Sequence, residues 1–293
     1  MQLVTIDNDT LRVEISALGA ELRSLIDKRD ETEHMWEADP KFWPRKAPIL
    51  FPCVGESKDG LITIEGAHYP MGRHGFTRNQ LFEVVGLTGE SVVFELKQNA
   101  ETLAHYPFNF TFRITYSLDG QSLIHNFEVV NNADSTLGFQ LGGHPAFAVP
   151  FDRSEAFLDY QIRFDQNMTL DRHLLNAKGL YNGKTRNVLD DSNTIELNYE
   201  LFNEDALVFK EIPSKSVWIE NKNGGKRLRV DYEGFPHLGI WSKSGADYVC
   251  IEPWIGCADH EDQPDDFFEK DSVVLLKPKE TFKASFSVSL INQ

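Results

Sequence analysis

Residues 110–120 have the sequence Phe110-Thr111-Phe112-Arg113-Ile114-Thr115-Tyr116-Ser117-Leu118-Asp119-Gly120, and this stretch decides the fold class. Apolar side chains occupy every second position up to Leu118, which is typical of a β-strand with one face toward a core and one toward water. Asp119-Gly120 is a strong hairpin-turn signal, and residues 123–130 then have the composition of a returning strand. We therefore expect two antiparallel strands joined by a tight turn.

The same two-residue period recurs along the chain. Apolar side chains alternate with polar ones in residues 11–15, 228–232 and 282–290, and turn signals rich in Asn, Asp and Gly separate such segments. Helical periodicity is weak, although residues 154–160 and 262–271 could each hold one short helical turn. The most irregular stretch is 165–194. The sequence predicts an all-β sandwich or barrel of mostly antiparallel strands with few short helices.

Size and composition narrow the class of protein further. The 293 residues can form one large β domain, and no linker or change in composition divides them, so we expect a single domain over residues 1–293. A net charge of −16 makes nucleic acid and acidic membrane surfaces poor partners. The three cysteines, Cys53, Cys250 and Cys257, are too few for a disulfide framework and lack the CxxC spacing of structural zinc sites.

The sequence also bears on where the protein works. Its N-terminus lacks the basic and apolar regions of a signal peptide. No stretch approaches the roughly 20 apolar residues needed to span a bilayer. We expect a cytoplasmic protein that is a monomer or a homodimer and that does not interact with membranes.

Two histidines and one glutamate lie in constrained loop-and-strand settings. His74 is followed by Gly75, which permits a tight turn. His144 lies between two glycines and Pro145, and the proline restricts it to extended conformations. Glu252 ends the apolar run 248–251, where a carboxylate is costly to bury unless it is paired or functional. Acid–base chemistry near neutral pH is one interpretation; structural hydrogen bonds for the histidines and an ion pair for Glu252 are the other.

Further residues could bind a polar ligand. Asp205 precedes an apolar strand and could accept hydrogen bonds from hydroxyl groups, or it could only initiate the strand. Tryptophans such as Trp241 could stack on the apolar face of a sugar, or belong to the core. Arg45, Arg73 and Arg78 form a basic cluster that could contact a phosphate or a sugar oxygen. The acidic run 259–266 lacks the alternating spacing of a calcium loop, so we expect no metal site.

These residues belong to segments that resemble the aldose 1-epimerase (galactose mutarotase) superfamily, and more closely its LacX-like branch. The resemblance covers nearly the whole chain and is specific as an ordered set. The segments that carry it are Trp43-Pro44-Arg45-Lys46-Ala47-Pro48-Ile49-Leu50-Phe51-Pro52, Arg73-His74-Gly75-Phe76, Gly143-His144-Pro145-Ala146-Phe147, Asp205-Ala206-Leu207, Gly239-Ile240-Trp241-Ser242-Lys243 and Ile251-Glu252-Pro253-Trp254-Ile255-Gly256.

The resemblance implies a β-supersandwich fold with a cofactor-free sugar cleft. It implies that Glu252 is the general base, His144 the general acid and His74 a substrate-binding histidine, with Asp205 holding sugar hydroxyls. The chain departs from the family at one place. Where mutarotases carry an Asn-Arg-Ile segment upstream of the first histidine, this chain has Phe51-Pro52-Cys53-Val54-Gly55-Glu56, and Arg45 or Arg73 could replace that arginine in space.

Three functions remain open from the sequence. The first is interconversion of the α and β anomers of a hexose. The second is the same reaction on a hexose 6-phosphate, with an arginine holding the phosphate. The third is non-catalytic carbohydrate binding or regulation through the same cleft. A glycoside hydrolase fits less well because it normally needs two opposed carboxylates, and only Glu252 and Asp205 could supply them.

Overall fold

The hairpin predicted from residues 110–120 is confirmed in the computed structural model, which describes residues 2–263 and 266–291. Strands β10 (Phe110–Asp119) and β11 (Ser122–Asn131) pair antiparallel from Phe110↔Asn131 to Asp119↔Ser122. The apolar side chains of β10 are buried, whereas Arg113, Thr115 and Ser117 between them are partly exposed. Half-burial of the hairpin therefore explains the two-residue period.

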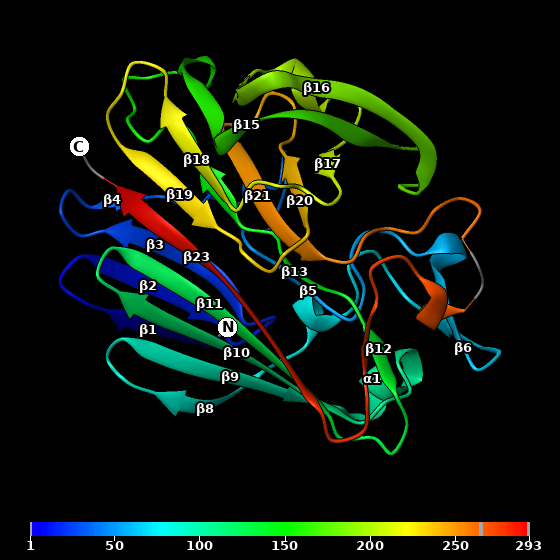
Figure 1. Cartoon of the computed structure of the whole chain (residues 1–293). Coiled ribbons are helices and arrows are strands. Elements are labelled where there is room, and N and C mark those ends of the chain that lie inside the picture. Colours follow the sequence, from blue (N-terminus) through cyan, green and yellow to red (C-terminus); the bar gives the residue numbers. More distant parts are fainter. Residues whose placement is uncertain (1, 264–265, 292–293) are drawn as a thin grey trace.

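The hairpin belongs to a 15-stranded sheet that forms most of the molecule (Figure 1). Its path runs β5-β13-β21-β20-β17-β15-β18-β19-β23-β11-β10-β9-β8, with β14 paired to β21 and β16 paired to β15, and every pairing is antiparallel. The further strands of this sheet are β5 (Ile49–Leu50), β8 (Glu83–Leu87), β9 (Ser91–Lys97), β13 (Leu141–Gly143), β14 (Ala146–Ala148), β15 (Tyr160–Leu175), β16 (Tyr181–Glu196), β17 (Leu207–Phe209), β18 (Ser216–Asn221), β19 (Arg227–Asp231), β20 (His237–Trp241), β21 (Tyr248–Ile255) and β23 (Thr281–Ile291).

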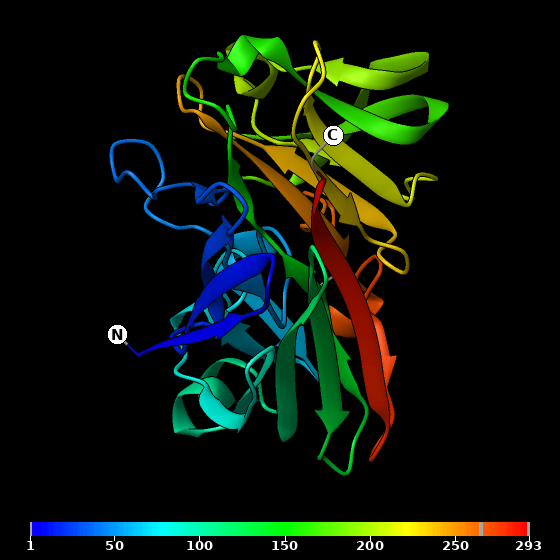
Figure 2. The same cartoon turned by 90° about the vertical axis from the view of Figure 1, so that its left-hand side faces the viewer.

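A second sheet at the N-terminus covers part of the large one. It has the order β1 (Leu3–Asp7), β2 (Leu11–Ser16), β3 (Glu21–Asp27) and β4 (Thr32–Glu33). The two views place it beside β9, β10 and β11 (Figures 1 and 2). Its apolar side chains share one buried cluster with theirs, and the Tyr116 hydroxyl donates a 2.6 Å hydrogen bond to the Ala20 carbonyl. This cluster extends from Val4 to Leu290, and the single domain over residues 1–293 stays a prediction.

Small elements complete the fold. Two two-stranded sheets pair β6 (Leu61–Ile64) with β7 (Ala67–Pro70), and β12 (Leu137–Phe139) with β22 (Val274–Leu276). The described residues contain one α-helix, α1 (Ala100–His105), which Asn99 caps by accepting a hydrogen bond from the Thr102 backbone N–H. Single 3-10 turns are η1 (Lys58–Gly60), η2 (Thr77–Asn79), η3 (Phe157–Asp159), η4 (Tyr199–Phe202) and η5 (Phe267–Glu269).

The two expected helical turns are therefore present as 3-10 turns: η3 lies within residues 154–160 and η5 within residues 262–271. Pro264 and Asp265, which belong to the second range and to the acidic run, lie outside the described residues. Helices of a length and apolarity that would span a lipid bilayer are absent from the residues that the structure describes.

The stretch 165–194 is more regular than the sequence indicates. It forms most of the long hairpin of β15 and β16, which arches over one end of the large sheet in Figure 1. The pairing of the two strands shifts register at four places, the first between Arg163 and Met168. Each bulge changes which side chains face the core. A hairpin with several bulges therefore has no uniform two-residue period.

Candidate active site

Glu252 lies in the middle of a fully buried strand. All eight residues of β21 are buried, since β20 pairs along one edge and β13 and β14 along the other. The Glu252 side chain is only 1% exposed. This burial, together with the Asp205 carboxylate nearby, raises the pKa of Glu252 well above its ordinary value. The expectation that Glu252 ends the apolar strand is wrong, because the strand continues through Pro253 to Ile255.

His144 lies in the short link between β13 and β14, directly beside β21. The link is held in place because the His144 N–H donates to the Pro48 carbonyl at 3.1 Å and the Ile251 N–H donates to the Pro145 carbonyl at 3.2 Å. The Trp43 ring stacks on the imidazole with centroids 4.9 Å apart. Burial, together with the positive charges of Arg78 and Arg73, lowers the pKa of His144 to about 3.

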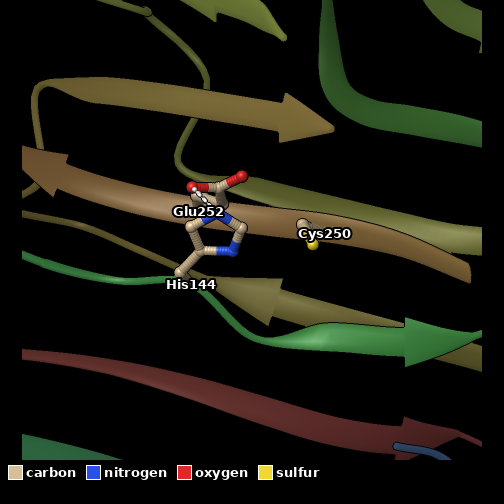
Figure 3. A group of neighbouring side chains, drawn as sticks. All are labelled: His144, Cys250 and Glu252. Atoms are coloured by element: carbon tan, nitrogen blue, oxygen red, sulfur yellow. Dashed lines mark ion pairs between the residues drawn. The ribbon is translucent and has the colours of Figure 1, made fainter. Parts of the chain in front are cut away.

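The two side chains form a buried pair. His144 Nε2 lies 3.2 Å from Glu252 Oε2 (Figure 3), yet neither Glu252 Oε2 nor His144 Nδ1 has a hydrogen-bond partner among the described residues. A raised carboxyl pKa beside a lowered imidazole pKa means that the pair holds one proton across a wide pH range. Such a pair can give a proton at one end and take one at the other.

A hydrogen bond fixes which ring nitrogen of His74 carries the proton. Its backbone has φ +66°, and the Gly55 N–H donates a 3.0 Å hydrogen bond to its Nδ1. Because Nδ1 accepts, the ring proton of neutral His74 is on Nε2. Loss of hydration, with repulsion from His144 and Arg78, holds the pKa of His74 well below its ordinary value. His74 is therefore a neutral hydrogen-bond donor at neutral pH.

Gly75 gives His74 this position. Its φ is +73°, and a Cβ there would lie 2.1 Å from the Phe51 carbonyl oxygen. The chain passes so close because the Phe76 N–H donates to that same oxygen at 3.1 Å. Only glycine fits this approach, so the sequence reading of Gly75 as the residue that lets the backbone turn beside the imidazole is confirmed.

These groups line one cavity of about 770 Å³, part of it open to solvent. The mixture of aromatic walls with a few polar groups is typical of small-molecule sites. The lining residues are Trp43, Pro48, Gly55, Glu56, Arg73, His74, Arg78, His144, Leu175, Gly179, Tyr181, Asp205, Ala206, Val208, Trp241, Glu252, Trp254 and Ala258.

The three arginines of the basic cluster differ in position. Arg73 lines the cavity, and its Nε donates to Glu56 Oε2 at 2.8 Å. Arg78 also lines it and donates to the Arg73 carbonyl at 2.7 Å, while its buried Nε has no hydrogen-bond partner among the described residues. Arg45 is not among the lining residues and donates instead to Asn79 at 3.2 Å. Its expected contact with substrate is therefore not supported by its position.

Asp205 also lines the cavity, just before β17. Its backbone has φ +74°, and its Oδ1 accepts a 2.8 Å hydrogen bond from the Ala206 N–H. The side chain is partly exposed and lines the cavity. The remaining carboxylate oxygen can accept hydrogen bonds from a ligand.

Comparison with known proteins agrees with this geometry. The sequence model of the aldose 1-epimerase family matches residues 2–289. The chain belongs to the aldose 1-epimerase family. Protein LacX (chromosomal) of Lactococcus lactis subsp. lactis is 32% identical over 299 residues, covering 99% of each chain.

Two similar solved structures confirm the fold. A galactose mutarotase related enzyme from Lactobacillus acidophilus has a TM-score of 0.95 and 38% identity, covering 99% of this chain and 98% of its own. A galactose mutarotase-like protein from Lactobacillus casei has a TM-score of 0.93 and 30% identity, covering 99% of this chain and 100% of its own. The expected mutarotase-type fold and the LacX-like resemblance are thus confirmed.

The structure brings most of the expected site residues together. His74, Arg73, Asp205 and Trp241 line the same cavity as His144 and Glu252. Four lining residues were not predicted from the sequence. They are Glu56 and three residues at the tip of the β15–β16 hairpin, Leu175, Gly179 and Tyr181. No local signal identifies these three, because Tyr181 reaches the cavity by pairing with His260, far away in the sequence.

Gly179 offers a test of this hairpin wall. It has φ +80°, and a Cβ there would lie 2.3 Å from a terminal nitrogen of Arg73. Gly179→Ala therefore displaces the Arg73 guanidinium from Glu56 and weakens sugar binding, and the left-handed backbone adds roughly 1–2 kcal/mol of strain. Tryptophan fluorescence titration with aldoses measures the affinity, and urea unfolding measures the stability.

Gly66→Ala is the matched control. Gly66 has nearly the same backbone conformation, φ +79°, but a Cβ there meets nothing within 4 Å. We expect it to lose similar stability and to keep the affinity of the unsubstituted protein. Equal affinity losses in both variants would show that the contact with Arg73 is irrelevant to binding.

Proposed function

We propose that the protein interconverts the α and β anomers of an aldohexose by acid–base opening and closure of the sugar ring. The observation that carries the proposal is the His144–Glu252 pair, with 3.2 Å between Nε2 and Oε2, in the wall of a cavity lined by aromatic and polar side chains. Membership of the aldose 1-epimerase family supports a sugar as the ligand.

The pair can perform both proton transfers of the reaction. In the reactive state Glu252 is a carboxylate and His144 is protonated, a state reached by moving the one shared proton across the pair. Glu252 takes the proton of the C1 hydroxyl while His144 protonates the ring oxygen, so the C1–O5 bond breaks and the aldehyde forms. Rotation about C1–C2 and closure with the roles reversed give the other anomer and restore the shared proton.

The surrounding residues would hold the sugar in place. His74 can donate its Nε2 proton to the ring or C1 oxygen, because its Nδ1 is occupied by the Gly55 N–H. Asp205 can accept hydrogen bonds from ring hydroxyls. The indole rings of Trp43, Trp241 and Trp254 line the cavity and can pack on the apolar faces of a sugar.

Saturation-transfer NMR tests the proposal directly. Catalytic amounts of protein are added to a panel of free and phosphorylated aldoses, and magnetisation exchange between the two anomeric protons is measured. Accelerated exchange of at least one aldose supports the proposal. Saturable sugar binding without faster exchange across the panel would instead assign the cavity to a carbohydrate-binding or regulatory protein.

A second candidate is the same reaction on a phosphorylated hexose, and Arg78 favours it. No carboxylate of the described residues lies within ion-pair distance of Arg78, its Nε has no partner, and its guanidinium lines the cavity. Burial and the nearby charges of Arg45 and Arg73 lower the pKa of Arg78. A half-buried cation without an ion pair is costly, and an anionic group on the substrate would offset that cost.

Arg78→Met distinguishes the two substrates. If the substrate carries a phosphate, losing one charged hydrogen bond costs about 1.5–3 kcal/mol, so kcat/KM on the phosphorylated aldose falls about 10–100-fold while the rate on the free aldose changes little. Arg45→Met is the control, since Arg45 belongs to the same basic cluster but does not line the cavity. A loss of equal size in both variants would exclude a specific phosphate contact by Arg78.

A further inference from the structure

A thiol lies beside the acid–base pair. Cys250 and Glu252 are alternate residues of β21, so their side chains point to the same face of the strand. His144 lies against this face, because Ala146 of β14 pairs with Cys250. Figure 3 shows the carboxylate above the imidazole and the thiol to one side of it. One ligand atom from each of the three residues lies within 4.8 Å of the others.

The proposed reaction uses neither the thiol nor every polar atom around it. Cys250 is fully buried, His144 is 8% exposed and Glu252 1%. His144 Nδ1 and Glu252 Oε2 have no hydrogen-bond partner within the described chain. Buried polar atoms without partners are uncommon in native proteins, and two of them converge here with a sulfur atom. Cys250 and Glu252 belong to β21, and His144 lies in the short link between β13 and β14, which backbone hydrogen bonds hold beside β21.

We propose that His144, Cys250 and Glu252 form a binding site for a divalent transition-metal ion of the zinc type, and that the bound ion blocks the sugar reaction. The second half of this proposal rests on the proposed function; the first half does not. Imidazole, thiolate and carboxylate are the ligands that zinc prefers, and three protein ligands with one open position are typical of exchangeable zinc sites. Two of the three ligand residues, His144 and Glu252, line the sugar cavity.

The geometry needs little adjustment. Zinc bonds of 2.0–2.3 Å in a tetrahedral arrangement place ligand atoms about 3.3–3.7 Å apart. His144 Nε2 and Glu252 Oε2, at 3.2 Å, already fit this spacing. One ligand atom of each residue lies within 4.8 Å of the others, so the group of three has to contract by about 1 Å. An ion can enter from the cavity, whose wall contains both His144 and Glu252.

Binding of the ion and catalysis exclude each other. The ion takes the carboxylate and a lone pair of the imidazole, which are the groups that would move protons to and from the sugar. The thiol and carboxyl protons leave when the metal binds. Zinc would therefore act as a reversible inhibitor that competes with the sugar.

Cobalt(II) is the probe for the binding step, since its spectrum identifies the ligands without any sugar. Chelator-treated protein is titrated with Co²⁺, and we expect a thiolate-to-cobalt charge-transfer band with the visible bands of a tetrahedral centre. Cys250→Ala abolishes the charge-transfer band. Cys53→Ala and Cys257→Ala are matched controls, because both cysteines are equally buried, and they keep it. Glu252→Gln is a second ligand variant and weakens binding without removing the thiol.

Zinc affinity is then measured by displacement of cobalt. Cys250→Ala should lower it by more than the roughly 10–100-fold that loss of an outer-shell partner typically costs. Zinc should slow anomer exchange by the unsubstituted protein, and saturating sugar should weaken zinc binding. Absence of the thiolate band, or its loss in Cys257→Ala as well, overturns the metal site. A thiolate band in a protein that accelerates no sugar exchange would overturn the proposed function and leave the metal site standing.

Discussion

Glu252→Gln lowers the rate of anomer interconversion by about 10²–10⁴-fold, the usual contribution of a positioned acid or base. Glutamine has almost the shape of glutamate but can neither take the C1 hydroxyl proton nor return it. Because the pKa of Glu252 is raised well above its ordinary value by burial, the native side chain already spends much of its time uncharged. The variant therefore keeps the fold, and saturation-transfer NMR isolates the chemical effect.

The stability of the variant has a definite pH dependence. A carboxyl group whose pKa is higher in the folded protein than in the unfolded chain stabilises the fold at low pH, and this stabilisation is lost as the pH rises above 4.5 toward the folded pKa. Urea unfolding should show Glu252→Gln gaining stability relative to the unsubstituted protein with rising pH. Glu220→Gln, at a buried carboxylate paired with Arg163 outside the cavity, serves as a control with unchanged activity. An active Glu252→Gln protein would remove Glu252 from the mechanism.

His144→Ala has an effect of similar size, about 10²–10⁴-fold on the exchange rate. The substitution deletes the group that protonates the ring oxygen and leaves a space between Trp43 and Glu252. This space opens toward the sugar cavity, because His144 is one of its lining residues. Imidazole added to the solution can occupy it, and we expect imidazole to restore part of the rate. Polarimetry with increasing imidazole measures the recovery.

His125→Ala is the matched control for this prediction. His125 is equally buried and stacks on Phe286 with centroids 4.2 Å apart, as His144 stacks on Trp43, but it does not line the cavity. We expect the variant to keep the full exchange rate and to show no response to imidazole. If His144→Ala kept the full rate, or were slow but indifferent to imidazole, a proton-transfer role for His144 would be ruled out.

The half-buried strands are the part of the fold that sequence predicts well. β2, β10 and β11 each carry one face toward the core, so their apolar residues recur with a period of two. β21 is buried on both faces and shows only an apolar run with a glutamate inside it. For that reason the sequence could suggest a strand near Glu252 but not where it ends. The bulges of the β15–β16 hairpin conceal two long strands in the same way.

Only those parts of the site that lie within one short sequence segment can be predicted from the sequence. The turn at His74-Gly75 and the His144-Pro145 link are visible as short motifs, and Glu252 is conspicuous as a carboxylate in an apolar segment. The approach of His144 to within 3.2 Å of Glu252 depends on pairing between distant strands, which no single segment encodes. The positions of Glu56 and Tyr181 in the cavity wall depend on the same kind of long-range pairing. The separation of Arg45 from Arg73 and Arg78 could likewise be learned only from the structure.

The β15–β16 hairpin supplies ligand contacts from a part of the chain that is separate from the proton-transfer pair. The proton-transfer pair is held by the buried strand β21 and by the link between β13 and β14, where most substitutions would disturb the core. Another part of the cavity lining comes from the hairpin tip, residues 175–181. Backbone contacts hold this tip in place, such as the 2.9 Å hydrogen bond from the Tyr181 N–H to the Asp259 carbonyl. Length and composition of the tip can change without moving the pair. Substitutions at residues 176–180, whether natural or from a directed library, can thus change the size of ligand that the cavity accepts without changing the proton-transfer chemistry.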